Sequence, residues 1–217
     1  MAVAARYHRP AMASAALPSS IAGLPVPQDG VSAATWRRAQ STLPRYLLAH
    51  SVRSYCWGAQ IAASEGLTFD SQVLWTAALF HDVGLTRLPR NTMCFEVEGA
   101  EMARGFLEEN GMAPGKADAA AIAIILHMQP NVRLEDGVEA VLLDRATAVD
   151  VRGAEYESIE RVRAAVVGRY PRGAFDRHFL RAIEREATRR PTCQSARLLG
   201  DGDLADAMAR SPWAAAT

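Results

Sequence analysis

The sequence of 217 residues lacks an excess of charge of either sign. Lysine and arginine together number 24, and so do aspartate and glutamate, which makes the formal net charge zero at pH 7. A neutral chain has no general electrostatic attraction to nucleic acid or to anionic lipid. Local basic patches stay possible, but the composition argues for none, and we expect no nucleic-acid partner.

Cysteine is scarce, since the chain has only Cys56, Cys94 and Cys193. These residues are odd in number, far apart in sequence, and form no Cys-x-x-Cys pair. This pattern fits buried thiols in a reducing compartment better than a disulfide framework or a structural zinc site. The sequence therefore predicts free thiols and a cytoplasmic location.

Long apolar runs and strand-like patterns are also lacking. No run approaches the ~20 apolar residues needed to span a bilayer, so we expect no membrane partner. No segment alternates apolar and polar residues over four or more positions, and there is no Gly-rich phosphate loop or Gly-x-Ser-x-Gly motif. Because 49% of the residues are hydrophobic, the chain can still form a sizeable core. The sequence predicts an all-α fold.

Composition divides the chain into three parts. Residues 1–33 are rich in Ala, Ser, Pro and Gly without periodicity, which predicts a flexible, extended N-terminal arm; a targeting segment is the alternative. Residues 34–195 predict a bundle of about six to eight helices, and residues 196–217 a peripheral tail. Within the bundle, turn and cap residues punctuate the helices: the long helix 45–65, for example, stops at Gly66.

The doublet His81-Asp82 ends the apolar run 73–80 and precedes Gly84, where we expect the helix to end. A helix that is apolar nearly all round lies inside a protein. Burying an imidazole and a carboxylate there is unfavourable unless something pairs with them, and a metal ion pairs with both. Alone, the doublet fits a histidine bonded to a loop carbonyl and an aspartate capping a neighbouring helix better than it fits a metal site.

Two further histidines lie among apolar residues of predicted helices. His50 shares the apolar face of helix 45–65, where it fits either a core histidine or a metal ligand. His127 stands at the end of the apolar run 119–126 and is separated by one residue from Gln129-Pro130, which terminates the helix. Both side chains are therefore expected at the inner face or inner end of a buried helix.

Acidic candidates come from two regions. In helix 137–150, Asp150 falls at the rim of the apolar arc, where a side chain can reach inward, whereas Asp144 is expected to point toward water. Glu96 and Glu98 lie at the start of the next helix after the doublet, where acids also complement a helix N-terminus. Asp150 is thus the better candidate for a buried acid.

The order of His50, His81-Asp82 and Asp150 resembles the metal-dependent HD superfamily, in which four such side chains hold a metal inside a helical bundle. The local context is similar at residues 50–53, 79–84 and 149–153. The resemblance covers about residues 45–153. It implies that His50, His81, Asp82 and Asp150 are metal ligands.

A narrower similarity is to the cyanamide hydratase branch of that superfamily, whose enzymes add water to a carbon–nitrogen triple bond with zinc. The similar segments are 81–86, 95–96, 125–129 and 148–153, and more loosely 170–173 and 190–191. These segments extend the resemblance to about residue 195. The two extra histidines of the dinuclear oxygenase branch are not both present, because only His127 lies between His81 and Asp150, which favours a single metal.

The resemblance implies a mechanism. Two imidazoles and two carboxylates suit Zn²⁺, with Fe²⁺ or Mn²⁺ also acceptable, and metal-bound hydroxide would attack a small nitrile-like compound such as cyanamide to give urea. Asp82 or Glu96 would transfer the proton, and His127 would orient substrate or water as a donor. The expected partner is a small molecule, and a homo-oligomer is compatible with the sequence. The expected substrate-pocket residues, whose aromatic members also fit plain core packing, are Trp57, Phe80, Thr86 and Phe95.

Two other functions remain open from the sequence. The same metal could act as Lewis acid in a phosphohydrolase of a nucleotide or phosphoester, with Arg87 or Arg90 on the phosphate. Alternatively, a non-enzymatic module could have kept the helical shell, although the complete ligand set argues against it.

Overall fold

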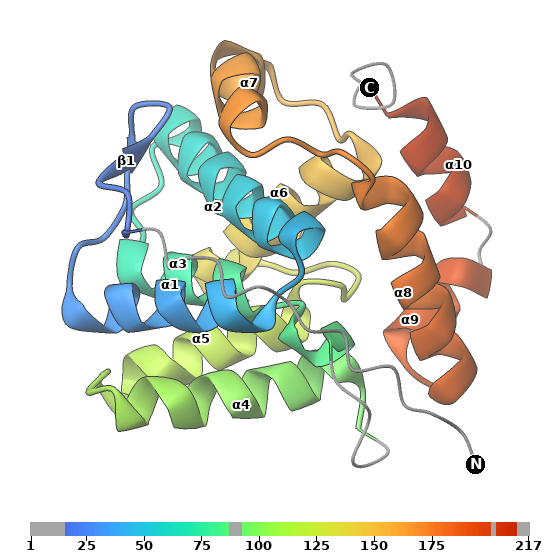
Figure 1. The fold of residues 1–217 in the computed structure, drawn as a ribbon, viewed down its shortest axis with the longest axis horizontal. Coiled ribbons are helices and arrows are strands. Elements are labelled where there is room, and N and C mark those ends of the chain that lie inside the picture. The colour runs from blue at the N-terminus through green and yellow to red at the C-terminus, as the bar shows by residue number, and fades with distance from the viewer. Residues whose placement is uncertain (1–15, 87–92, 201–202, 212–217) are drawn as a thin grey trace, which may run out of the picture.

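Ten α-helices dominate the structure, a computed structural model that describes residues 16–86, 93–200 and 203–211 (Figure 1). The all-α prediction is confirmed. The helices are α1 (Gly30–Thr42), α2 (Arg45–Glu65), α3 (Ser71–Phe80), α4 (Phe95–Glu109), α5 (Pro114–Leu126), α6 (Val138–Arg152), α7 (Glu157–Arg169), α8 (Phe175–Arg189), α9 (Gln194–Gly200) and α10 (Asp203–Arg210). Helices α1 to α8 correspond to the predicted bundle. Two short 3-10 helices are η1 (Val83–Thr86) and η2 (Leu134–Asp136).

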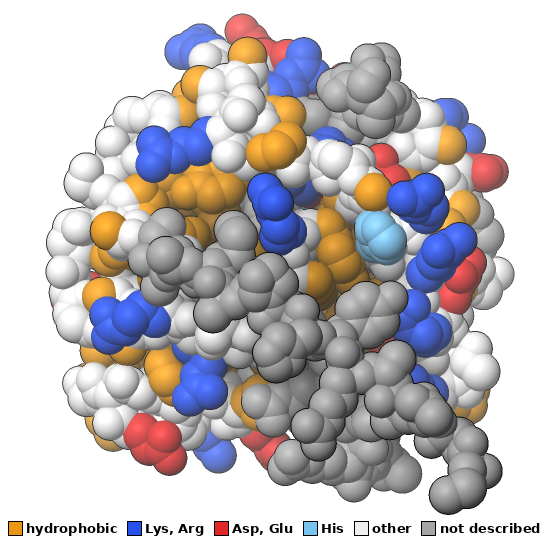
Figure 2. Space-filling view, viewed as in Figure 1, with side chains coloured by type: hydrophobic (Ala, Val, Ile, Leu, Met, Phe, Trp, Pro, Cys, Tyr) orange, Lys and Arg blue, Asp and Glu red, His pale blue; other side chains and the backbone are white. Residues whose placement is uncertain are grey.

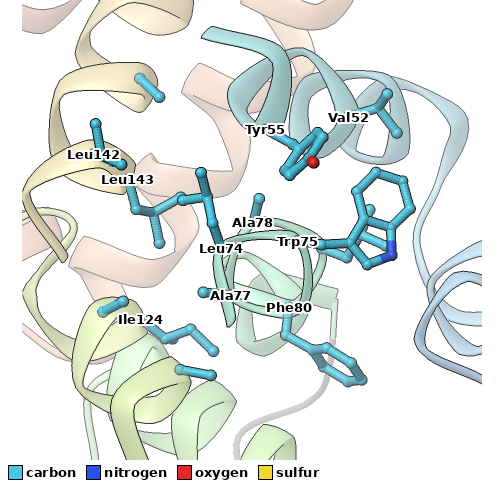
Figure 3. Close-up of a cluster of buried hydrophobic side chains, with 14 of the residues drawn as sticks. Val52, Tyr55, Leu74, Trp75, Ala77, Ala78, Phe80, Ile124, Leu142 and Leu143 are labelled. Atoms are coloured by element: carbon cyan, nitrogen blue, oxygen red, sulfur yellow. The ribbon is translucent and has the colours of Figure 1, made fainter. Parts of the chain in front are cut away.

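Helix α3 is the centre of the core. Every residue from Val73 to Phe80 is buried, and the helix packs against α1, α2, α4, α5 and α6. In Figure 3, Leu74 and Ala77 of α3 lie toward side chains of α5 and α6, while Trp75 lies on the side of α2. The Asp70 side chain caps the helix by accepting hydrogen bonds from two backbone amides, as its position predicts. Burial on all sides is what the apolar run indicated.

The end of α3 differs slightly from the prediction. The helix stops at Phe80, His81 is its C-cap, and Asp82 leads into η1 instead of extending the helix to Gly84. Gly84 is needed for close packing, since a Cβ at this position would stand 2.1 Å from the carbonyl oxygen of Phe95 at the start of α4. This contact holds the segment after the doublet against α4.

Helix α2 has the predicted ends. Pro44 precedes it, and Gly66 stops it in the left-handed conformation with φ of 68°. Its neighbours are α3, α6, α7 and α8, so several of its faces are covered and even Arg53 and Trp57 are fully buried. The helix therefore carries polar side chains from its interior face into the centre of the bundle.

The segment before α1 is more ordered than the sequence indicated. Strands β1 (Ser20–Ile21) and β2 (Leu24–Pro25) pair antiparallel, with Ile21 opposite Leu24. Ile21 is fully buried, and the Tyr55 hydroxyl donates to the Pro25 carbonyl at 2.7 Å. The prediction of a flexible arm is therefore wrong for residues 16–33, because a few apolar side chains suffice to fix the segment on α2. Residues 1–15 lie outside the described part.

The C-terminal segment is likewise no peripheral tail. Helices α8, α9 and α10 stand together at the right of Figure 1, and α10 contacts α6 as well as α9. A disulfide between Cys94 and Cys193 joins the start of α4 to the residue before α9, while Cys56 is free and buried. The prediction that all three thiols are free is wrong, because the fold brings together cysteines 99 positions apart. The cysteine-based argument for a reducing compartment loses its premise.

The surface has a local charge pattern that the neutral total conceals. Helix α8 exposes Arg177, Arg181, Arg185 and Arg189 at four-residue intervals, and Lys and Arg side chains gather on this side of the molecule (Figure 2). Helix α8 therefore carries a local basic patch of the kind that the composition left possible, because composition alone cannot reveal clustering.

None of the helices in the described ranges has the length and apolar character that a bilayer crossing requires.

Candidate metal centre

Three acceptor atoms converge at the inner ends of α2 and α3. His50 Nε2 lies 3.0 Å from His81 Nε2, and Asp82 Oδ2 lies 3.6 Å from the first nitrogen and 3.3 Å from the second. All three side chains are about 1% exposed. Two ligand atoms that are each about 2.1 Å from a tetrahedral ion stand about 3.4 Å apart, so these separations suit one shared metal ion.

The hydrogen bonds of the two Nδ1 atoms determine whether each Nε2 atom in the cluster carries a proton or a lone pair. His81 Nδ1 lies 2.8 Å from the Ala78 carbonyl oxygen, and His50 Nδ1 lies 2.7 Å from Asp150 Oδ2. Both partners can only accept, so both Nδ1 atoms donate and both neutral rings present a lone pair on Nε2. Asp82 Oδ2 has no hydrogen-bond partner among the described residues.

Three buried lone pairs that face one another without a donor need a positive charge between them. Burial alone would raise the pKa of Asp82, but His81 and His50 together lower it by more, so that it falls to about 2. Burial lowers the pKa of His81, and the Asp82 carboxylate raises it by more, above its usual value. A proton on His81 and a divalent cation are therefore competitors for one position, and His50, His81 and Asp82 fit a metal site.

Asp150 lies behind His50, on the side of the ring away from this cluster. Its Oδ1 accepts from Arg53 Nε at 2.8 Å and from Trp57 Nε1 at 2.9 Å. Its Oδ2 accepts from Arg53 at 2.7 Å and from His50. Arg172 donates to the Asp150 backbone carbonyl at 2.6 Å and stands 3.3 Å from Oδ2. These donors leave the carboxylate fully engaged.

The sequence predicted that Asp150 would bind the metal together with the other three residues. The structure brings His50, His81 and Asp82 together and places Asp150 next to them, where it orients the His50 ring. Burial would raise the pKa of Asp150, but the Arg53 guanidinium lowers it by more, to well below its ordinary value. Direct coordination by Asp150 stays a prediction, and its position behind His50 is what the described contacts give.

His127 lies beside the cluster, with ring centroids 4.9 Å from His81. Its Nδ1 is 2.6 Å from the Ile124 carbonyl oxygen, so this nitrogen donates and Nε2 carries the lone pair of the neutral ring. Burial lowers the pKa of His127 to about 3, and the ring is neutral at pH 7. A neutral ring in this tautomer accepts a hydrogen bond at Nε2, in contrast to the donor role that the sequence suggested.

A cavity of about 230 Å³ opens next to the cluster. His50, His81, Asp82 and His127 form one part of its lining, and residues 128–130 after α5 adjoin them. Helix α6 forms a wall, and α8, α9 and α10 contribute the rest. The lining residues from these four helices are Asp144, Thr147, Ala148, Val151, Arg152, Phe179, Gln194, Leu198 and Leu204. The tail that the sequence assigned to the periphery is therefore part of the cavity.

None of the four residues expected to line the substrate pocket is among the described lining residues. Trp57 is fully buried and donates to Asp150, while Phe95 is fully buried with its ring centroid 6.1 Å from that of His127. Phe80 stacks near Phe106, and Thr86 donates to the Val83 carbonyl. The prediction that these four residues line the pocket is therefore wrong for this cavity, because residues near the doublet in sequence need not lie beside the cavity in space.

Glu96, the second acid predicted to transfer a proton, is also absent from the cavity lining. It is 2% exposed, its Oε2 has no hydrogen-bond partner among the described residues, and burial raises its pKa. The neighbouring Glu98 accepts from Arg190 at 2.8 Å, which ties α4 to the end of α8. We therefore give Glu96 no part in the chemistry at the cluster.

Some site residues carried a usable signal in the sequence, and others carried none. Arg172 belongs to the 170–173 segment that resembled the cyanamide hydratase branch, and the structure shows why an arginine there matters. Asp144 was expected to point toward water, because it sits on the polar side of its helix, but it lines the cavity together with residues of α8, α9 and α10. Gln194 and Leu204 could not be connected to the site before the tail was placed.

The model of the HD domain family matches residues 47–165, more than half of the chain. The matched range contains all four residues of the predicted ligand set. HD domains are typically metal-dependent hydrolases, which agrees with the donor-free cluster of His50, His81 and Asp82. A comparison with curated proteins finds no match.

Proposed function

This chain belongs to the HD domain family, and from that premise we propose that it is a single-metal hydratase or hydrolase of a small nitrile-like compound. The favoured substrate type is cyanamide, with urea as the product. One observation carries the proposal: three buried lone pairs meet at 3.0 to 3.6 Å with no donor between them. Such an arrangement is favourable only around a positive charge, which is either a proton on His81 or a metal cation.

The residues of the chain have separate roles in this proposal. His50, His81 and Asp82 would hold the ion, and Asp150 keeps the His50 ring turned so that Nε2 faces it. A bound divalent ion lowers the pKa of water from ~15.7 toward ~7, which supplies hydroxide at neutral pH. Zn²⁺ suits two imidazoles and a carboxylate, and Fe²⁺ or Mn²⁺ are alternatives.

Proton transfer falls to groups that reach the cavity. Asp82 lines it and has a second carboxylate oxygen beside the one in the cluster, so we assign to Asp82 the relay of a proton, which its carboxylate would accept from the attacking water and pass to the substrate nitrogen. His127 Nε2 accepts a hydrogen bond from water or substrate and orients it, because its Nδ1 is committed to the Ile124 carbonyl. Neither role requires Glu96.

The cavity supports a small substrate. Pockets that bury drug-sized ligands usually measure ~300–1,000 Å³, and this cavity measures about 230 Å³. Its wall includes apolar side chains such as Ala148, Val151 and Leu198, which exclude water from the reacting atoms. A molecule with few heavy atoms and a polar end fits these dimensions better than a nucleotide does.

A second candidate function is a metal-dependent phosphohydrolase. Arg152 lines the cavity and offers a guanidinium to a phosphate. The two arginines that the sequence suggested for this task, Arg87 and Arg90, lie outside the described residues. We rank this function second because the cavity is small and also contains the carboxylate of Asp144.

Product analysis of the metal-loaded protein separates the two functions. We expect urea from cyanamide without release of phosphate from a panel of nucleotides and phosphoesters. His81→Ala should abolish turnover, whereas His178→Ala, which alters a half-buried histidine stacked on Tyr46 of α2, should leave turnover unchanged. Phosphate release without urea would transfer the assignment to the phosphohydrolase, and turnover of neither substrate by the loaded protein would refute both.

A further inference from the structure

One face of α6 forms a continuous wall of the cavity. Asp144, Thr147, Ala148, Val151 and Arg152 all line it, and their spacing of three, four, seven and eight residues places them along a single helix face. The metal-centre residues line the same cavity from α2, α3 and the end of α5. The metal-centre residues and the polar groups of α6 therefore face the same cavity.

The carboxylate of Asp144 is the acid on this wall. It is half-buried, and no hydrogen bond or ion pair to its side chain is found among the described residues. Thr147, one turn away, donates to the Asp144 backbone carbonyl at 2.9 Å and not to the carboxylate. The carboxylate therefore loses part of its hydration without gaining a protein donor in return.

The two arginines nearest in sequence do not neutralise this acid. Arg145 is paired with Glu65 at 2.8 Å, on the outside of the helix. Arg152 is exposed and forms no ion pair with Asp144 within 4.0 Å. Burial raises the pKa of Asp144 to about 6, and Arg152 and Arg145 only partly oppose that shift. At pH 8 the group is an anion in need of a donor.

We propose that Asp144 determines specificity by accepting N–H hydrogen bonds from an amino, amidine or similarly nitrogen-bearing end of the substrate. The inference rests on the proposed function and deepens it, since it names the chemical class of the group opposite the nitrile nitrogen that receives the proton. Cyanamide has such a group, because its amino nitrogen offers two N–H donors. The same carboxylate repels phosphate and carboxylate ligands, so it selects against anions as well as for N–H donors.

The probe is acetamidinium chloride, titrated at pH 8 into the full chain loaded with Zn²⁺ and monitored by ¹H–¹⁵N NMR. Neutral acetamide, of nearly the same shape, is the reference ligand. The variants are Asp144→Asn and, as matched control, Asp118→Asn on the exposed face of α5, where only a 3.7 Å ion pair with Arg104 is lost. Near-ultraviolet circular dichroism verifies that each variant is folded.

We expect acetamidinium to perturb amides of cavity residues such as Ala148 and Leu198. Its affinity should fall about 10-fold or more in Asp144→Asn, as expected for loss of a charge-assisted hydrogen bond, and should not change in Asp118→Asn. Acetamide should bind wild type and Asp144→Asn within two-fold, because the Asn carbonyl still accepts a hydrogen bond. A purely structural role of Asp144 would weaken both ligands equally.

Three results would overturn the inference: no acetamidinium binding to wild type, an equal affinity for Asp144→Asn, or perturbations away from the cavity. None of them depends on turnover, so the inference and the proposed function fail separately. Asp144-dependent acetamidinium binding by a protein that does not hydrate cyanamide would refute the hydratase and retain the specificity residue. Cyanamide hydration with the same KM in Asp144→Asn as in wild type would retain the hydratase and refute the role of Asp144 in specificity.

Discussion

The two carboxylates on either side of His50 are equally buried but differ in their hydrogen-bond partners. Asp82 Oδ2, on the Nε2 side, has no hydrogen-bond partner among the described residues. Asp150, on the Nδ1 side, accepts from Arg53, Trp57 and His50. Asp82 Oδ2 therefore has a lone pair available for a cation, whereas the Asp150 carboxylate is surrounded by N–H donors.

This difference explains which nitrogen of the His50 ring carries the proton. Because Asp150 is saturated with donors, it stays ionised and holds the proton of His50 on Nδ1. The lone pair of His50 is thereby fixed on Nε2, where it meets the lone pairs of His81 and Asp82. The buried arginine thus supports the metal centre at a distance, through one carboxylate and one ring.

Removing the unpartnered oxygen should have the largest effect. Asp82→Asn replaces a ligand oxygen by an amide, so we expect metal affinity to fall by more than the ~100-fold that loss of an outer-shell contact can cause. Turnover should be lost with it. Metal content after dialysis against a buffered metal solution measures the affinity, and Asp136→Asn on the exposed η2 helix serves as control. Retention of metal at the wild-type level would show that Asp82 is not a ligand.

Removing the cation beside Asp150 should chiefly affect stability. Arg53→Met leaves a fully buried carboxylate with fewer donors, which we expect to lower the free energy of unfolding by about 3–5 kcal/mol. Urea denaturation followed by circular dichroism gives the value. The same change at exposed Arg181 of α8 should lower it by less than about 0.5 kcal/mol. Equal effects at the two positions would mean that the Arg53–Asp150 pair contributes nothing particular.

Neutralising Asp150 tests whether it acts through His50 or binds directly. Asp150→Asn keeps the shape but loses the anion that orients His50, so we expect metal affinity to fall about 10- to 100-fold, less than in Asp82→Asn. Isothermal titration with Zn²⁺ on both variants measures this order. A loss as complete as that of Asp82→Asn would instead make Asp150 a direct ligand, as the family pattern implied.

The smallest effect should come from one of the neutral donors to Asp150. Trp57→Phe removes the indole N–H that lies 2.9 Å from Oδ1, while Arg53 Nε still donates to that oxygen. We expect a loss of about 1 kcal/mol in the free energy of unfolding and no change in metal affinity. Thermal denaturation gives the first quantity and Zn²⁺ titration the second. A fall in metal affinity would extend the supporting network to the indole.

Much of the fold could be predicted because local patterns decide it. The apolar run 73–80 indicated a buried helix, and Gly66 indicated the end of α2; both are confirmed. The doublet and His50 were found for the same reason, since a polar residue in an apolar pattern stands out. These signals lie within a few residues of the feature they predict.

Long-range features could not be predicted in that way. The Cys94–Cys193 disulfide joins residues 99 positions apart, and nothing in the spacing of the cysteines indicates the pair. Asp144 was assigned to water because a helical wheel gives the direction of a side chain but not what covers it. Here Asp144 is half-buried and lines the cavity together with Leu198 and Leu204 of the tail. Residues near the doublet in sequence, such as Thr86, do not line it.

The most direct measurement is anomalous diffraction from crystals of the protein loaded with one divalent cation and recorded at the absorption edge of that metal. The account predicts a single peak at about 2.0–2.3 Å from His50 Nε2, His81 Nε2 and Asp82 Oδ2, with Asp150 still bonded to His50 Nδ1. A metal peak elsewhere, or none in a protein that binds the ion in solution, would contradict the assignment of this cluster as the metal centre.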